Sequence, residues 1–114
     1  MKKGKAGFRS QAIYRSNLDY RALWNIEDGF HRDYSIYHTQ KGIVQIFPSK
    51  ARHPLVQVSP GGKVLITYTT IKELREAIST LQKIAGQSLR LELRKANPSS
   101  DEMRRVYSLY ITGH

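Results

Sequence analysis

Residues 63–85 read KVLITYTTIKELREAISTLQKIA and place a strand, a helix start and a helix in direct succession. The first seven of these residues are rich in β-branched and apolar side chains with mixed character on both faces, which predicts a central strand. Thr70 and Glu73 have the spacing of a capping box, and apolar residues then recur every three or four positions until Gly86. The pattern predicts a helix over 71–85.

Strand-like segments flank this unit on both sides. Residues 89–95, LRLELRK, alternate strictly, with leucines facing one way and charged residues the other, which predicts a sheet with one solvent-exposed face. Residues 43–47, IVQIF, and 55–59, LVQVS, predict two further strands. We therefore expect an α+β fold with a mostly antiparallel sheet of about five strands and the 71–85 helix packed on one face.

The segment 16–38 admits two interpretations. Apolar residues at helical spacing follow a cap at Ser16 or Asn17, which indicates a helix. The Asp28-Gly29 pair, however, lies between two aromatic and β-branched runs and is typical of a type I′ hairpin turn. We favour strand, turn, strand for this segment.

The two ends of the chain carry different patterns. Residues 1–15 are basic and contain no acid, so we expect a flexible basic arm ahead of a single α+β domain over 16–114. Ser99 and Glu102 form a second capping box that predicts a C-terminal helix, although the later run VYSLYI also alternates well enough to be a last strand.

The charge balance points to a polyanionic partner. Nineteen Lys and Arg against nine Asp and Glu give a formal net charge of +10, an excess that costs folding stability unless an anion relieves it. Nucleic acid is the commonest such anion, and the alternative is a basic protein with no polyanionic partner. The chain has no cysteine, which excludes disulfides and thiolate metal sites.

Hydropathy bears on the location of the protein. The basic N-terminus is not followed by an apolar run of signal-peptide length, and no run of about 18 apolar residues occurs. We therefore expect an intracellular protein that does not span a membrane.

Basic residues gather on the loops around the 55–59 strand and on the predicted exposed sheet face. Together with the arm they could line an extended strip, which suits a phosphate backbone better than a small anion. Two tyrosines of the run YSIYH could stack on bases, whereas Trp24, Phe30 and Tyr68 are expected in the core. The predicted nucleic-acid-binding residues are Lys2, Lys3, Lys5, Arg9, Lys50, Arg52, His53, Lys63, Arg90, Arg94, Tyr34 and Tyr37.

The Gly61-Gly62 pair is predicted to form a hairpin turn. Its exposed amides beside Lys63 could also approach a phosphate closely. Phosphate-loop and nucleophile-elbow motifs do not occur in the sequence, so we predict no cofactor, no metal and no small-molecule substrate.

Two other classes of function stay open. The first is a small metal-dependent nuclease or nicking enzyme, with a metal near Glu27, Asp28, His31 and Asp33. His31 and His38 stand seven residues apart, unlike the closely spaced histidine pair of rolling-circle endonucleases. The second is a structural or protein-interaction subunit. We expect a homodimer, which an edge strand such as LRLELRK could form by pairing across a two-fold axis, and which fits either this class or nucleic-acid binding.

The run GGKVLITYTTIKELREAISTLQKIAG, residues 61–86, resembles the strand-and-helix end of single-strand DNA-binding proteins of the transcriptional-coactivator and Whirly type. The whole chain is also similar in style to small uncharacterised proteins of rod-shaped viruses that infect hyperthermophilic archaea. Neither resemblance supplies a residue signature, so no site residue is taken from these families.

Overall fold

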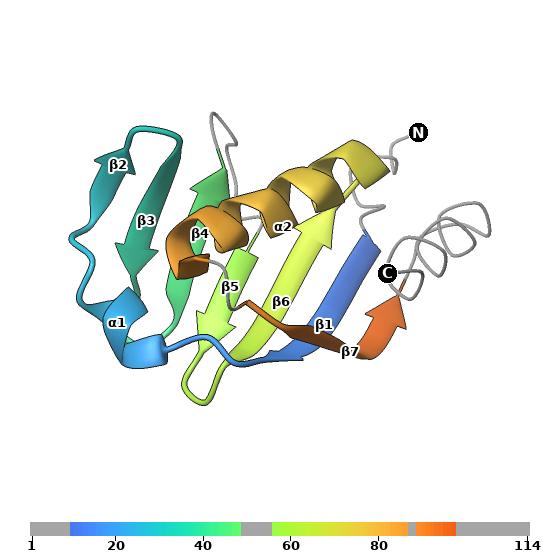
Figure 1. The fold of residues 1–114 in the computed structure, drawn as a ribbon, viewed down its shortest axis with the longest axis horizontal. Coiled ribbons are helices and arrows are strands. Elements are labelled where there is room, and N and C mark those ends of the chain that lie inside the picture. The colour runs from blue at the N-terminus through green and yellow to red at the C-terminus, as the bar shows by residue number, and fades with distance from the viewer. Residues whose placement is uncertain (1–9, 49–55, 87–88, 98–114) are drawn as a thin grey trace.

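A single antiparallel sheet with one long helix across it organises the protein (Figure 1). The computed structural model describes residues 10–48, 56–86 and 89–97. Its elements are β1 (Ser10–Ser16), α1 (Tyr20–Trp24), β2 (Gly29–His31), β3 (Tyr34–His38), β4 (Val44–Pro48), β5 (Val56–Ser59), β6 (Lys63–Tyr68), α2 (Ile71–Ala85) and β7 (Leu91–Asn97).

The strand order is β2-β3-β4-β5-β6-β1-β7, and every neighbouring pair is antiparallel. The α+β fold is therefore confirmed, but the sheet has seven strands rather than about five. The expected count was too low because β1 lies in the segment expected to be a flexible arm, and because the residues after the expected Asp28-Gly29 turn form two strands, β2 and β3, rather than one.

The start of α2 is fixed by side-chain capping. The Thr70 hydroxyl oxygen accepts a hydrogen bond from the backbone N–H of Glu73 at 3.2 Å. The Glu73 carboxylate in turn accepts from the backbone N–H and the hydroxyl of Thr69, each at 2.7 Å. Gly86, with a φ of 82°, ends the helix. The predicted helix over 71–85 is confirmed. The predicted capping box forms in half, because Thr70 caps Glu73 while the Glu73 carboxylate binds Thr69, the residue before the cap.

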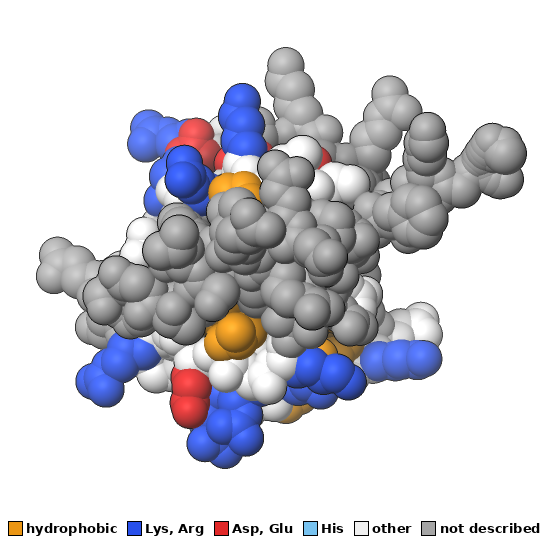
Figure 2. Space-filling model, turned by 90° about the vertical axis from the view of Figure 1, so that its right-hand side faces the viewer, with side chains coloured by type: hydrophobic (Ala, Val, Ile, Leu, Met, Phe, Trp, Pro, Cys, Tyr) orange, Lys and Arg blue, Asp and Glu red, His pale blue; other side chains and the backbone are white. Residues whose placement is uncertain are grey.

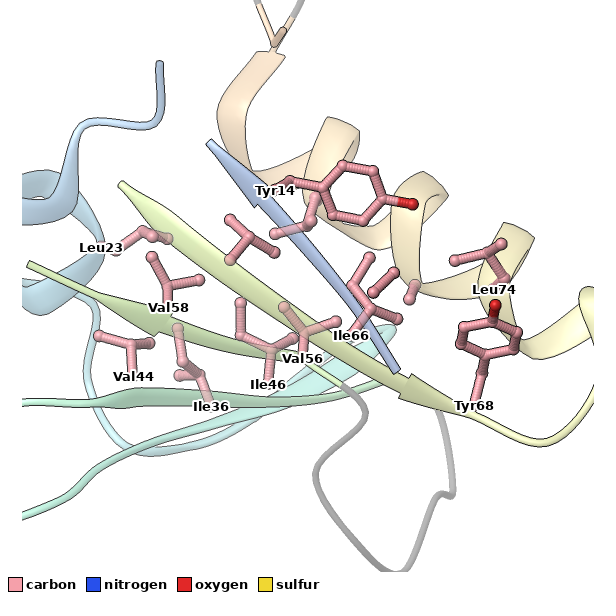
Figure 3. Packing of buried hydrophobic residues seen from close by; sticks show 14 residues of the cluster. Tyr14, Leu23, Ile36, Val44, Ile46, Val56, Val58, Ile66, Tyr68 and Leu74 are labelled. Carbon is pink, nitrogen blue, oxygen red and sulfur yellow. The ribbon is translucent and has the colours of Figure 1, made fainter. Parts of the chain in front are cut away.

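The core lies between α2 and one face of the sheet, which we call the inner face (Figure 3). Side chains alternate along the strands, so every second residue of the central strands points inward and is buried. Each large apolar side chain that is fully buried contributes about 1.5–3 kcal/mol. The buried apolar residues are Ala12, Tyr14, Leu23, Ile36, Val44, Ile46, Val56, Val58, Val64, Ile66, Tyr68, Leu74, Ala77 and Leu81.

Strand β1 changes the expected boundary of the basic arm. It pairs with β6 on one side and with β7 on the other, and Ser10, Ala12 and Tyr14 are buried. Residues 10–15 are thus part of the sheet, so the arm predicted over 1–15 cannot include them. Residues 1–9 lie outside the described residues.

The segment before β3 differs from the favoured strand, turn, strand interpretation. Asp19 accepts a hydrogen bond from the backbone N–H of Ala22 at 3.2 Å and caps the short helix α1. The β2–β3 hairpin turns at residues 32–33, where Arg32 has a φ of 59°. Asp28 and Gly29 do not form the predicted type I′ turn, because Gly29 is the first residue of β2 and pairs with Ile36. The Asp28 carboxylate accepts a hydrogen bond from the backbone N–H of His38, the last residue of β3.

Strand β7 forms one end of the described sheet. It begins two residues later than the segment 89–95 predicts, and Arg94 is the extra residue of a β-bulge opposite β1. The predicted C-terminal helix beyond Ser99 lies outside the described residues. Neither α1 nor α2, the helices in the described part of the chain, has the length and apolar character needed to cross a membrane.

Candidate nucleic-acid interface

The candidate site is the face of the sheet that points away from α2, which we call the outer face. Leu23 of α1 and Leu74, Ala77 and Leu81 of α2 all belong to the inner-face core. Within residues 10–48, 56–86 and 89–97, both helices therefore contribute to the inner layer. Among the residues that the structure describes, only strand side chains lie on the outer face.

The strand register arranges outer-face side chains in rows that run across the sheet. Paired residues in neighbouring antiparallel strands point to the same face, so the register identifies each row. The first row contains Tyr37, Gln45, Gln57, Leu65, Ile13 and Lys95. A second row contains Ser59, Lys63, Arg15 and Glu92. A third row lies on the other side of the first row from the second one. It contains Phe30, Ser35 and Phe47.

One side of the outer face is basic. Lys63 on β6, Arg15 on β1, and Arg94 and Lys95 on β7 are all exposed, and we call these four residues the basic cluster. Glu92 lies among them, opposite Arg15, and its carboxylate is 3.6 Å from the Arg94 guanidinium. Figure 2 faces the β7 side of the molecule and shows many Lys and Arg side chains near its margins.

The other side of the outer face is aromatic. Phe30, Tyr37 and Phe47 come from β2, β3 and β4, and we call them the aromatic cluster. Phe30 is 66% exposed and Tyr37 is 42% exposed. The rings of Tyr37 and Phe47 meet edge to face with their centroids 5.7 Å apart. The polar side chains of Gln45 and Gln57 lie between this cluster and the basic cluster.

The structure brings only some of the predicted binding residues onto the outer face. Lys63, Arg94 and Tyr37 lie there. Arg90 precedes β7 and is exposed, and its backbone N–H donates to the Asn17 side chain at 2.8 Å. Seven further predicted residues lie outside the described residues: Lys2, Lys3, Lys5, Arg9, Lys50, Arg52 and His53.

Tyr34 points to the opposite face from Tyr37. Its partner in β4 is the buried Pro48, and it packs against the inner-face core. Its ring stacks on that of His31 with centroids 5.7 Å apart. Tyr34 and Tyr37 are three positions apart in one strand, so the alternation of side chains prevents them from stacking on the same bound chain.

Sequence reasoning missed Phe30, Phe47 and Lys95 and assigned Arg15 to the arm. Phe30 was expected in the core. In the described part of the chain, however, Phe30 is more exposed than the other exposed large hydrophobic residues, Trp24 and Tyr37. The signal that could have found it is the alternation of β3: once the hairpin turn is set at residues 32–33, Phe30 lies opposite Ser35 on the solvent side.

The Gly61-Gly62 turn is confirmed, with φ values of 90° and 89°. Gly62 is buried, its backbone N–H donates to the Ser59 carbonyl at 3.1 Å, and its carbonyl accepts from Ser16. The Gly62 amide is therefore engaged within the protein and is not open to a phosphate.

The residues of the nuclease alternative do not converge. The Asp28 carboxylate binds the His38 ring, the His31 ring contacts the Glu27 carbonyl at 2.6 Å, and Asp33 lies 3.5 Å from the Lys83 ammonium. Across the described ranges, no group of three or more His, Cys, Asp or Glu side chains is arranged to hold a metal ion.

A groove of about 290 Å³ lies on the other side of the molecule, beside α1 and the end of α2. Its lining is mostly aliphatic and includes no Lys or Arg, so it does not extend the interface. The lining residues are Asn17, Leu18, Asp19, Ala22, Leu23, Ile26, Ile84, Ala85 and Leu89.

Comparisons of the chain with protein-family models, with curated proteins and with solved structures found no match. The resemblances to coactivator and Whirly proteins and to archaeal viral proteins therefore stay predictions.

Proposed function

We propose that this protein binds nucleic acid with low sequence specificity and that the outer face of its sheet neutralises the phosphates. The observation that carries the proposal is the basic cluster, in which three adjacent strands present four cations around one acid. Such an arrangement would displace counterions from a polyanion, which is the main source of non-specific affinity.

The placement of the cations supports an extended ligand. Neighbouring strands lie about 4.8 Å apart, so cations on β6, β1 and β7 spread across roughly 10 Å. Successive phosphates of one chain match this spread better than a single small anion does. The net charge of +10 adds a favourable long-range field for the approach of a polyanion. An intracellular location, where nucleic acid is abundant, fits this proposal.

The test is a fluorescence-anisotropy titration of labelled oligonucleotides at several salt concentrations. A variant with Arg15, Lys63 and Lys95 replaced by Gln should bind more weakly, and its salt slope on a single strand should fall by up to about two units. The matched control replaces Lys41, Lys72 and Lys83 by Gln, which removes the same charge from exposed positions away from the outer face. Equal losses in both variants would show that net charge alone attracts the ligand.

The same titration separates the nuclease alternative. Binding alone survives a chelator and leaves the oligonucleotide intact on a gel, whereas a metal-dependent nuclease degrades it only when metal is present. The predicted binding residues Lys50 and Arg52 are tested by an Ala variant of their own, because they follow Phe47 of the aromatic cluster closely in the sequence.

We also propose that the protein forms a homodimer through β7. This strand is last in the order of the described sheet, and no described strand pairs with its outer edge, whose backbone groups could pair antiparallel with a second copy. Pairing of two β7 strands around a two-fold axis would place two basic clusters side by side.

A further inference from the structure

We infer that the outer face selects single-stranded over double-stranded nucleic acid, with bases stacked on the aromatic cluster and phosphates held by the basic cluster. This inference rests on the proposed function. It adds that the ligand is single-stranded, and it assigns base stacking to the three residues of the aromatic cluster. Two of these, Phe30 and Phe47, were not among the binding residues predicted from the sequence.

The exposure of the aromatic cluster is the first support. Phe30 and Tyr37 expose 66% and 42% of their surface on the same face, beside the partly exposed Phe47. The inner-face core contains none of these three rings, although large aromatic side chains gain much from burial. Aromatic side chains that stay exposed on an open sheet face provide surfaces on which unpaired bases can stack.

The relative position of the two clusters is the second support. One row of the register runs from Tyr37 on β3 through Gln45 and on to Lys95 on β7. With strands about 4.8 Å apart, Tyr37 and the strand of Lys63 are separated by roughly 14 Å. A single strand of about four or more nucleotides, the lower limit for small single-strand modules, could reach from one cluster to the other.

The chemistry of the two clusters distinguishes single strands from duplexes. In a duplex the faces of the bases are stacked on each other, so only phosphates and groove edges meet the protein. The aromatic cluster would then gain nothing from contact with bases. In a single strand the bases are free to turn toward the rings, and the amides of Gln45 and Gln57 can donate and accept hydrogen bonds at base edges.

The experiment compares two probes on the full chain: labelled oligothymidylate of about 16 nucleotides, at the upper end of the single-strand site size, and a duplex of the same length. The variants are Tyr37→Ala and Phe30→Ala, with Tyr37→Phe as the conservative change. Circular dichroism verifies folding, and because Phe30 is the more exposed ring, Phe30→Ala tests the proposal even if Tyr37→Ala is unstable.

The matched control is Trp24→Ala. Trp24 is 38% exposed, but it packs on Tyr20 and on the ring of His38 rather than in the aromatic cluster. We expect each Ala variant of the aromatic cluster to lose about 5- to 150-fold in affinity for the single strand. Duplex affinity should stay unchanged in these variants, and Tyr37→Phe and Trp24→Ala should retain single-strand affinity.

The outcomes separate this inference from the proposed function. Suppose that the wild-type protein binds both probes with a steep salt dependence. If the aromatic variants then keep their affinity, or lose the same affinity for both probes, base stacking is refuted and phosphate binding stands. Equal competition by inorganic polyphosphate, which has no bases, would refute the stacking role in the same way. If the wild-type protein binds neither probe at low salt, both proposals fail and the aromatic cluster becomes a candidate surface for a protein partner.

Discussion

Arg15 on β1 lies directly opposite Lys63 on β6, and both side chains are exposed on the outer face of the sheet. Like charges in directly opposite positions of an antiparallel pair destabilise a sheet, and opposite charges stabilise it by about 0.2–1 kcal/mol. The protein thus carries a locally unfavourable pair within the basic cluster. A bound phosphate would relieve this repulsion.

This pair predicts opposite effects on stability and on binding. Lys63→Glu should raise the free energy of unfolding by about 0.2–1 kcal/mol, because it replaces repulsion from Arg15 by attraction. The same change should weaken nucleic-acid binding more than loss of one charge elsewhere would. Urea unfolding at low and high salt measures the first effect, and the gain should shrink as salt increases.

The control for this substitution is Lys41→Glu, which makes the same change in net charge in the exposed β3–β4 turn. We expect it to leave stability nearly unchanged and to reduce affinity less. If Lys41→Glu raised stability as much as Lys63→Glu, the cause would be the overall charge of the chain and not the Arg15–Lys63 pair.

The Gly62 turn is a second feature with a measurable cost. Ser16 donates to the Gly62 carbonyl oxygen from its hydroxyl at 2.6 Å and from its backbone N–H at 3.0 Å. A Cβ at Gly62 would lie only 2.7 Å from the Ser16 carbonyl oxygen, while a Cβ at Gly61 would meet nothing within 4 Å. Both glycines have positive φ, so the two positions differ only in the space around them.

Gly61→Ala should therefore cost about 1–2 kcal/mol from its backbone conformation alone. Gly62→Ala should cost at least about 1 kcal/mol more, because the β5–β6 turn must also move away from Ser16. Thermal and urea unfolding of the two variants measure the difference. Equal losses would mean that the turn shifts freely and does not anchor β1 to β6.

The sequence predicts best where local and tertiary preferences agree. The α2 helix has a capping box, an apolar stripe and a glycine stop, and all three agree with its packing on the sheet. The strands β4, β5 and β6 are bounded by Pro and Gly and also match expectation. The segment before β3 does not, because the five-residue helix α1 depends on capping by Asp19 and on burial of Leu23, which no periodicity of that length can reveal.

The candidate site was harder to predict than the fold for a related reason. Arg15, Lys63 and Lys95 are far apart in the chain and become neighbours only through the order β6-β1-β7. The sequence of β1 carries no local signal that this strand lies between β6 and β7. Composition therefore predicts that a basic surface exists, and the pairing register identifies which residues form it.

Tyr68 predicts a change of stability at alkaline pH. Burial raises the pKa of its phenol above the ordinary value of 10.0, and a hydrogen bond with Ser10 partly opposes this shift. Because the folded-state pKa is the higher one, the unfolded chain loses its proton first as pH rises. The contribution of Tyr68 to the free energy of unfolding should therefore not depend on pH below about pH 10. It should fall as the pH rises from there toward the folded-state pKa.

Tyr68→Phe removes this group and tests the sign of the effect. Below about pH 10 this group should not make the difference in stability between the variant and the wild type depend on pH. Above about pH 10 the stability of the variant should fall less steeply than that of the wild type. The measurement is urea unfolding across this pH range, with Tyr37→Phe as a control at an exposed tyrosine. Parallel curves would contradict the role of Tyr68 in alkaline unfolding.

The proposed β7 dimer predicts a specific effect of proline at the bulge. Arg94 has no paired residue in β1, so Arg94→Pro breaks no β1–β7 residue pair. Sheets also tolerate proline at bulges and in edge strands. Proline would still obstruct pairing with a second β7 strand. Sedimentation over a range of protein concentrations should show a dimer for the wild type and for Arg94→Gln, and a monomer for Arg94→Pro. A dimer that persists in Arg94→Pro, with circular dichroism unchanged, would locate the interface away from the β7 edge.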